Sequence, residues 1–446
     1  MSGQSFGFTP QALRDLAQQV LDYARARGAT ATEVDVSEGF GHSVGVRHRE
    51  VETIEYNRDK GLGVTVYLGQ RRGYASSSDF SRPAIEAAVD AALSIARFTA
   101  ADPFAGLPDE HLLARDFADP GLYYPWQTSV EEAIKIARRC EEAAFDVSPM
   151  IKNSEGANVS TQQSHFISAN SLGFMGGYAS SRHSVSCSMI AGEGDAMQRD
   201  DWYISRRDAA DLADPEEVGD YCARRALARL GARKIKTCVV PVLFEAPVAA
   251  TLLGNFVYAV SGGSLYRKSS FLLDSLGKPV FSRNVNISER PHLPKAMGST
   301  PFDDDGVLTR DREVVESGVL QGYFLGTYSA RKLGLASTAN AGGSHNLILR
   351  SGPRNFEGML RLMDRGLLVT ELLGQGVNYV TGDYSRGAAG FWVENGRIKH
   401  AVEEITIAGN LRDMFQQVVD VGSDVLVRGT KHTGSILIEK MTVAGG

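Results

Sequence analysis

The sequence is poor in cysteine and contains no long apolar run. Its 446 residues include only 4 cysteines, which are widely spaced and form no C-x-x-C pair: Cys140, Cys187, Cys222 and Cys238. This usage is typical of a reducing compartment and predicts a cytoplasmic protein without a disulfide framework. The opening segment MSGQSFGFTPQALRDLAQQV has no basic stretch followed by an apolar core, and no run of residues is apolar for long enough to cross a bilayer. We therefore expect no secretory signal and no membrane span.

An excess of basic charge is also missing. The formal net charge is −6 and the pI is about 5.9, which argues against a nucleic-acid partner because phosphate binding depends on clustered Lys and Arg. The densest basic run is ALARLGARKIK at 226–236. Its Arg229 and Arg233 lie at helical spacing, and we interpret them as part of a solvated helix end.

Paired histidines are absent as well. The nine histidines show no pair at four- or five-residue spacing and none adjoins a cysteine cluster. The sequence therefore contains no local zinc motif, although ligands that the fold brings together from distant positions stay open.

The pattern of apolar residues predicts an α+β protein of three regions. A helix begins at Thr9 and Pro10, alternating strand-like segments follow, and a helix over 83–98 closes the first unit. A linker-like segment at 101–125, rich in Pro, Gly and Asp, precedes a second helix, strands, helix unit. From Thr237 onwards short strands separated by turn residues surround one apolar helix. The predicted domains are an N-terminal α/β domain at 1–115, a middle α/β domain at 116–232 and a C-terminal β-rich domain at 233–446.

The apolar helix begins with a glutamate in the segment VPVLFEAPVAATLLGNFVYAV, 240–260. In a helical zinc peptidase motif, two histidines bind the metal and the adjacent glutamate deprotonates the metal-bound water. Here Phe244 and Ala249 occupy the histidine places around Glu245, so no side chain offers zinc a lone pair. We expect Glu245 to act structurally, as a carboxylate near the positive end of a helix dipole. We expect no catalytic residue in this chain.

Three further motifs match known patterns only superficially. GHSVG at 41–45 resembles a nucleophile elbow but lies in an alternating strand pattern, and SARK at 329–332 lacks the companion motifs of serine-lysine acyl enzymes. FDDDG at 302–306 begins like a calcium loop, yet the twelfth position counted from Asp303 is Val314 rather than glutamate. We interpret the first as a strand, give the second no catalytic role and interpret the third as a turn.

Several stretches together resemble the TldD/PmbA family of bacterial peptidases, long labelled modulators of DNA gyrase. They are LFEAPVAATLLGNF, FDDDGV, VVESGVLQGYFLGTYSARKLGLASTANAGG, GVNYVTGDYSRGAAGFWVENGRIKHAVEEITIAGNL and the closing MTVAGG. Their order and span cover nearly the whole chain, and the fourth stretch is most similar to the PmbA (TldE) branch.

The resemblance implies that this chain is a non-catalytic subunit. In the TldD branch, the motif H-E-x-x-x-H and a cysteine near the C-terminus bind the catalytic metal. These positions correspond here to Phe244, Glu245 and Ala249 and to the cysteine-free segment 420–429, so only the glutamate is kept.

The family further implies a metal-free subunit, a pseudoenzyme without a cofactor of its own. Its expected partner is a zinc-bearing TldD-like chain, although a homodimer is not excluded by the sequence. The implied substrates are small unfolded peptides, including leader peptides of microcin-type products, and strand addition is one way to hold them. Two alternatives stay open: a metallopeptidase with a non-standard site, and a regulator of DNA gyrase or of a toxin-antitoxin system.

Overall fold

The computed structural model describes residues 5–445. Two of the predicted regions share one long, curved antiparallel sheet with the strand order β3-β2-β1-β4-β6-β7, and β5 pairs with β4. The join between the two regions is the pairing of β1 with β4, which runs from Glu33 opposite Asn170 to Val46 opposite Ala157. Strand β7 lies at one edge of this sheet.

Each region of the sheet has its own pair of helices, and this confirms the predicted order of helix, antiparallel strands and helix. The elements are α1 (Pro10–Ala26), β1 (Ala31–Arg47), β2 (Glu50–Leu68), β3 (Arg71–Ser77), α2 (Arg82–Phe98), α3 (Val130–Asp146), β4 (Ile151–Asn170), β5 (Met175–Gly176), β6 (Ala179–Ala191), β7 (Gln198–Arg206) and α4 (Pro215–Ala228). Short 3-10 turns occur at Glu110–Leu112, Gly194–Ala196 and Ala209–Asp211.

Local capping explains where these helices begin. The Thr9 hydroxyl accepts a hydrogen bond from the Ala12 backbone N–H at 3.1 Å, with Pro10 in the first turn. At the start of α3, Ser129 and Glu132 form a reciprocal capping box. Because each cap satisfies N–H groups that the helix cannot, these starts could be predicted from the sequence.

The C-terminal region is mainly β, as predicted. Its elements are β8 (Cys238–Phe244), α5 (Ala246–Ala259), α6 (Gly262–Tyr266), β9 (Ile287–Glu289), β10 (Arg312–Glu316), β11 (Val319–Leu320), α7 (Thr327–Leu333), β12 (Leu347–Leu349), α8 (Phe356–Met363), β13 (Gly366–Leu373), β14 (Asp383–Glu394), β15 (Arg397–Asn410), α9 (Leu411–Gln416), β16 (Val418–Val421), β17 (Leu426–Arg428), β18 (Lys431–Thr433) and β19 (Ile436–Ala444). They form two sheets, with the orders β11-β10-β9-β12-β18-β17 and β15-β14-β13-β8-β19-β16. The predicted apolar helix is α5, and the short helices α6 to α9 were not anticipated.

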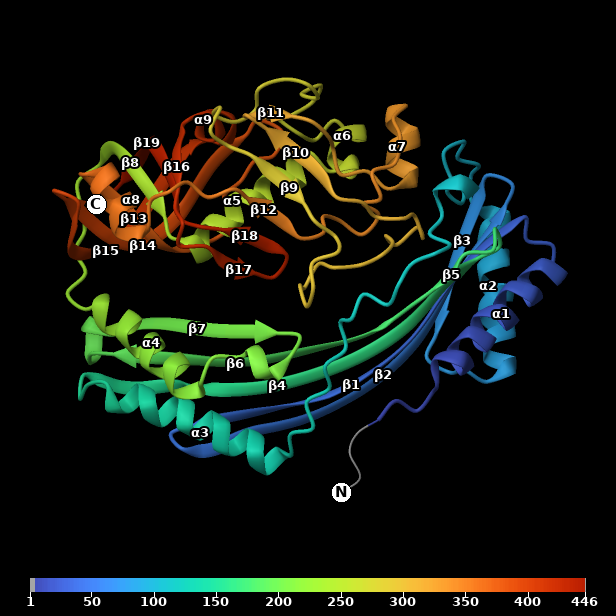
Figure 1. Ribbon diagram of the computed structural model, residues 1–446, viewed down its shortest axis with the longest axis horizontal. Helices are drawn as coiled ribbons and strands as arrows, with labels where there is room; N and C mark the ends of the chain where they lie inside the picture. Colours follow the sequence, from blue (N-terminus) through green and yellow to red (C-terminus); the bar gives the residue numbers. More distant parts are fainter. Residues whose placement is uncertain (1–4, 446) are drawn as a thin grey trace.

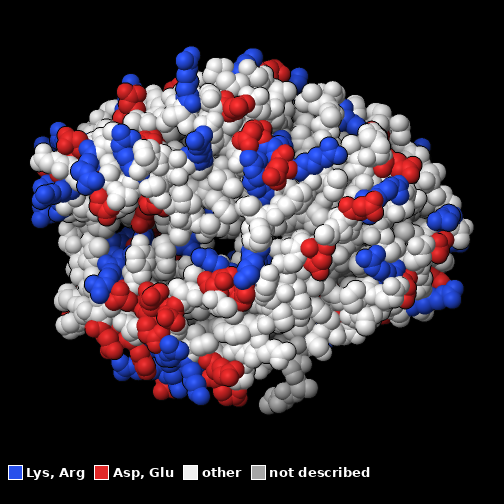
Figure 2. Space-filling view, in the orientation of Figure 1, with Lys and Arg blue, Asp and Glu red and all other residues white. Residues whose placement is uncertain are grey.

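The C-terminal region lies over the hollow side of the curved sheet, opposite α3 (Figure 1). Side chains connect the two at both ends. At one end Phe302 packs edge-on against Phe174, and at the other Arg428 donates a hydrogen bond to the Tyr203 carbonyl at 2.6 Å. Figure 2 shows an opening between the two halves with charged side chains near its rim. No helix in residues 5–445 combines the length and apolar character needed to span a membrane.

Candidate functional site

Helix α5 begins where β8 ends, and Glu245 is its N-cap residue. The Glu245 carbonyl accepts hydrogen bonds from Val248 N at 2.9 Å and Ala249 N at 2.7 Å, and its own N–H donates to the Val369 carbonyl at 3.0 Å. The Glu245 side chain makes no capping hydrogen bond. Its carboxylate is therefore free to bind elsewhere.

Buried apolar side chains occupy the two positions where zinc ligands are expected. Phe244 and Ala249 are both fully buried, and Phe244 lies on β8 between Val369 of β13 and Ile436 of β19. Neither side chain has an atom that could bind a metal, and within the described part of the chain no cluster of three or more His, Cys, Asp or Glu side chains could hold one. A zinc ion does not fit these residues.

The Glu245 carboxylate instead forms an ion pair across the boundary between regions. Its Oε1 and Oε2 accept hydrogen bonds from Arg225 Nη1 of α4 at 2.8 and 3.1 Å, and the two side chains are only 15% and 12% exposed. Burial raises the pKa of Glu245, and the adjacent Arg225 guanidinium opposes that rise. The electrostatic role expected of Glu245 thus has a specific cationic partner, which the sequence did not indicate.

This ion pair extends into a chain of alternating charges. Arg225 Nε donates to Asp200 Oδ1 of β7 at 3.1 Å, Arg229 lies 3.6 Å from the other oxygen of Asp200, and Arg229 reaches Glu371 of β13 at 2.5 Å. The prediction of a solvated helix end is wrong for Arg229, whose side chain is 13% exposed. The residue is covered because the C-terminal region packs over the end of α4. Arg233 is exposed as predicted, but it lies beyond the end of α4 and forms an isolated β-bridge with Val402 rather than part of the helix.

Two cavities flank these charges. The first, of about 430 Å³, lies between β7, one face of α5 and the β17–β18 hairpin. The second, of about 620 Å³, contains Glu245 in its lining and has apolar walls that include Phe356 and Phe391. Helix α5 and its N-cap residue Glu245 therefore adjoin two cavities that the side chains of this chain leave open.

The three superficial motifs have structural roles. Ser43 lies within β1, paired with Glu55 of β2 and Ser160 of β4, and not at a turn into a helix. Ser329 of α7 donates to the Gly326 carbonyl at 3.1 Å. Asp303 caps a turn by accepting backbone N–H groups from 305, 307 and 341. The interpretations of the first and third motifs, a strand and a turn, are confirmed.

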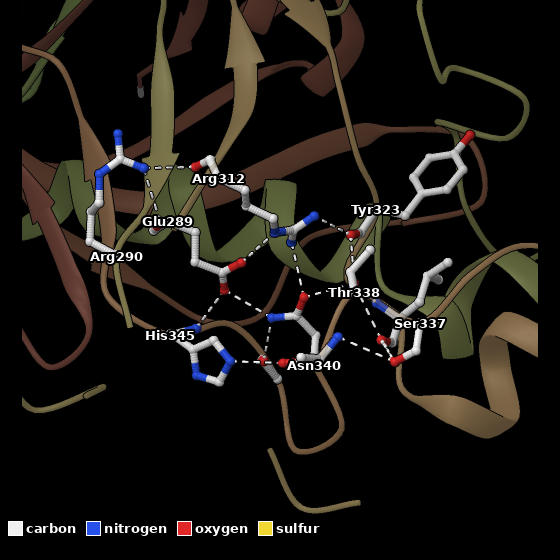
Figure 3. A network of polar contacts seen from close by, with 11 residues as sticks. Glu289, Arg290, Arg312, Tyr323, Ser337, Thr338, Asn340 and His345 are labelled. Atoms are coloured by element: carbon white, nitrogen blue, oxygen red, sulfur yellow. Dashed lines mark hydrogen bonds and ion pairs between the residues drawn. The ribbon is translucent and has the colours of Figure 1, made fainter. Parts of the chain in front are cut away.

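A second buried carboxylate, Glu289 of β9, serves as a comparison. It accepts hydrogen bonds from Arg312 Nε at 2.6 Å, Asn340 Nδ2 at 2.8 Å and the His345 backbone N–H at 2.7 Å. Figure 3 shows these groups converging on the carboxylate, with Arg312 also donating to the Tyr323 carbonyl at 2.8 Å. Both oxygens of Glu289 are occupied, so this network fixes the segment around 337–345 and leaves no group for a ligand.

Sequence reasoning missed Arg225, Asp200, Arg428 and Lys431, all of which line the first cavity. The segment VRGTKH at 427–432 offered one signal, because a glycine-containing turn between two basic residues is typical of a hairpin. Nothing local pointed to Arg225 or Asp200, whose importance depends on which region packs against them.

Comparison with known proteins identifies three segments of the chain. Residues 32–96 match PmbA/TldA metallopeptidase domain 1, residues 123–230 match the central domain, and residues 237–445 match the C-terminal domain. The predicted boundaries near 115 and 232 stay predictions.

Individual relatives extend over nearly the whole chain. Metalloprotease PmbA of Escherichia coli O157:H7 is 48% identical over 433 residues, which cover 97% of this chain and 96% of that protein. A candidate modulator of DNA gyrase from Bacteroides thetaiotaomicron has a crystal structure that matches with a TM-score of 0.93 at 28% identity, covering 98% of this chain and 100% of that one. TldE from Thermococcus kodakarensis matches in fold, with a TM-score of 0.81 at 21% identity, covering 96% and 100% of the two chains.

Proposed function

The chain belongs to the PmbA/TldD family of metallopeptidases, and from that premise we propose that it is the non-catalytic subunit of a two-chain zinc metallopeptidase. The observation that carries the proposal is the state of the former zinc motif. Phe244 and Ala249 are buried apolar residues, and Glu245 is paired with Arg225. A carboxylate that binds an arginine through both oxygens is poorly placed to accept a proton from a metal-bound water.

The partner in this proposal is a TldD-like chain that supplies the zinc, and the substrates are small unfolded peptides, including leader peptides of microcin-type products. The cavities beside α5 support a peptide-holding role because they border the exposed edge strand β7, whose outer backbone groups have no strand partner in the sheet. A cytoplasmic location fits the cysteine usage.

The test combines elemental analysis for zinc with a peptidase assay on an unfolded peptide. We expect no stoichiometric zinc in the purified chain, and activity only after a TldD-type chain is added. Glu245→Gln should leave the activity of the mixture unchanged, while the same change at the metal-adjacent glutamate of the TldD-type chain should abolish it. One tightly bound zinc per chain, or chelator-sensitive activity of the isolated chain, would overturn the proposal.

A second candidate, that this chain is itself a metallopeptidase, is favoured by the name of its 48% identical relative, Metalloprotease PmbA. The same assay separates the two candidates, because activity of the isolated chain is expected only for the second. A role on DNA gyrase, which the description of the Bacteroides structure suggests, is tested by asking whether the tagged chain recovers gyrase subunits or a TldD-type chain.

A further inference from the structure

The first cavity is bounded by three elements that leave room for an extended chain. Helix α5 faces it with Pro247, Ala250, Thr251 and Gly254, which recur at the spacing of one helix face and are all small or compact. The opposite wall is the edge strand β7, and the hairpin of β17 and β18 closes the third side. A volume of about 430 Å³ is in the range of pockets that bind small ligands, about 300–1,000 Å³.

Positive charge exceeds negative charge in this cavity. Its lining contains five basic side chains and three carboxylates: Arg199, Arg225, Arg229, Arg428 and Lys431 against Asp200, Asp201 and Glu371. The first three arginines have carboxylate partners, at 3.7 Å from Arg199 to Asp201, 3.1 Å from Arg225 to Asp200 and 2.5 Å from Arg229 to Glu371. Arg428 and Lys431 form no ion pair within residues 5–445.

Arg428 and Lys431 also occupy paired positions of one hairpin. Arg428 of β17 and Lys431 of β18 are directly opposed in the antiparallel register, so their side chains project from the same face of the hairpin. Both side chains are partly buried, and this burial lowers the pKa of each.

Packing holds both cations at the cavity. The Arg428 guanidinium lies over the rings of Tyr203 and Trp202, 3.9 and 4.3 Å from their centroids, and donates one hydrogen bond to the Tyr203 carbonyl. Because a guanidinium has several N–H donors, others stay available for a ligand. The Lys431 stem passes over Gly254, where an added Cβ would lie 3.7 Å from Cε.

We propose that Arg428 and Lys431 form a subsite for a carboxylate of an unfolded peptide, lying between α5 and the edge strand β7. The proposal rests on the proposed function and deepens it by naming the chemistry of the peptide that this chain holds. A carboxylate beside the two cations supplies the opposite charge that neither has within residues 5–445, and it can accept charge-assisted hydrogen bonds from both. A peptide fits better than a free anion, because the edge strand β7 can pair with a peptide backbone at positions other than the Tyr203 carbonyl, which Arg428 already binds.

The test is direct binding to the isolated chain, which needs no partner and no catalysis. An unstructured peptide with one internal glutamate and a free C-terminus, labelled at its N-terminus, is titrated by fluorescence anisotropy. We expect Lys431→Gln to weaken binding about tenfold, a loss of about 1.4 kcal/mol, and Lys431→Arg to restore most of it. The matched control is Lys440→Gln, an exposed lysine on β19, which should bind as the wild type does.

Two peptide variants identify which carboxylate is bound. Amidation of the C-terminus weakens binding if the terminal carboxylate occupies the subsite, and replacement of the glutamate by glutamine weakens it if the side chain does. The inference is overturned if the wild-type chain does not bind the peptide, if Lys431→Gln binds as tightly as the wild type, or if neither peptide change matters. If inorganic phosphate displaces the peptide completely, the site is reassigned to phosphate and the inference is also overturned. A chain that binds the peptide in this way but cleaves it alone would refute the proposed function and leave the subsite in place.

Discussion

Glu289 and Glu245 are both buried carboxylates paired with arginine, but they differ in where their partners come from. The Glu289 side chain is 1% exposed, and its partners Arg312, Asn340 and His345 all belong to the C-terminal region. Glu245 is 15% exposed and depends on Arg225, from the helix that ends the middle region. The first network therefore stabilises one region internally, while the second connects two regions beside open cavities.

The largest effect should follow from breaking the internal network. Glu289→Ala leaves the Arg312 guanidinium buried and removes acceptors from Asn340 and the His345 N–H, so we expect a loss of about 3–5 kcal/mol in unfolding free energy. Thermal and urea denaturation would measure it. The control is Glu313→Ala, whose pair with Arg290 is half-exposed and should contribute less than about 1 kcal/mol. Equal losses in the two variants would contradict the comparison.

A third carboxylate, Glu33 of β1, is partly buried and accepts a hydrogen bond from the Tyr67 hydroxyl at 3.3 Å. Burial raises its pKa from 4.5 to about 7. Because the folded state holds the proton more tightly, the stabilisation is complete below pH 4.5 and is lost as the pH rises through about 7.

The consequence can be measured with Glu33→Gln, which keeps the shape of the side chain and cannot ionise. We expect the variant to be about 2 kcal/mol more stable than the wild type at pH 8, and close to it at pH 5. Denaturant melts at the two pH values measure the difference. A gap that does not depend on pH would show that Glu33 is charged throughout.

A smaller loss is expected at the connection between regions. In Glu245→Gln, Arg225 keeps its bond to Asp200 at 3.1 Å and the amide can still accept one hydrogen bond, so we expect a loss of about 1 kcal/mol. Arg225→Met should cost more, because it leaves Glu245 and Asp200 without their shared cation. Chemical denaturation of both variants tests this order, and a Glu245→Gln loss as large as that of Glu289→Ala would remove the distinction between the two networks.

The smallest expected change in unfolding free energy is a gain rather than a loss. Lys431→Gln removes a partly buried ammonium that has no ion pair within residues 5–445, so without ligand we expect a gain of about 0.5 kcal/mol. Lys440→Gln, which removes an exposed lysine from β19, should leave the melting temperature unchanged. A clear loss of stability in Lys431→Gln would mean that this ammonium has a stabilising role in the free chain.

Much of the fold could be predicted because its signals are local. The Thr9 cap, the Ser129 capping box and the apolar stretch of α5 each act within a few residues of the element they define. The exposure of Arg229 could not be predicted in the same way. Its position at the end of α4 suggested solvent, and only the packing of β13, which brings Glu371 to it, makes it part of the buried charge network.

The sequence by itself determined the starts of helices α1 to α5, the α+β class and the absence of histidine beside Glu245, because caps, periodicity and side-chain chemistry are properties of neighbouring residues. Only the tertiary structure decided that Glu245 binds Arg225, and that Arg428 and Lys431 share a cavity with β7. The physical reason is that these interactions join residues that are close in space but far apart along the chain. A buried charge is stabilised by groups within a few ångströms in space, and the packing of the C-terminal region over the curved sheet selects those groups from distant parts of the chain.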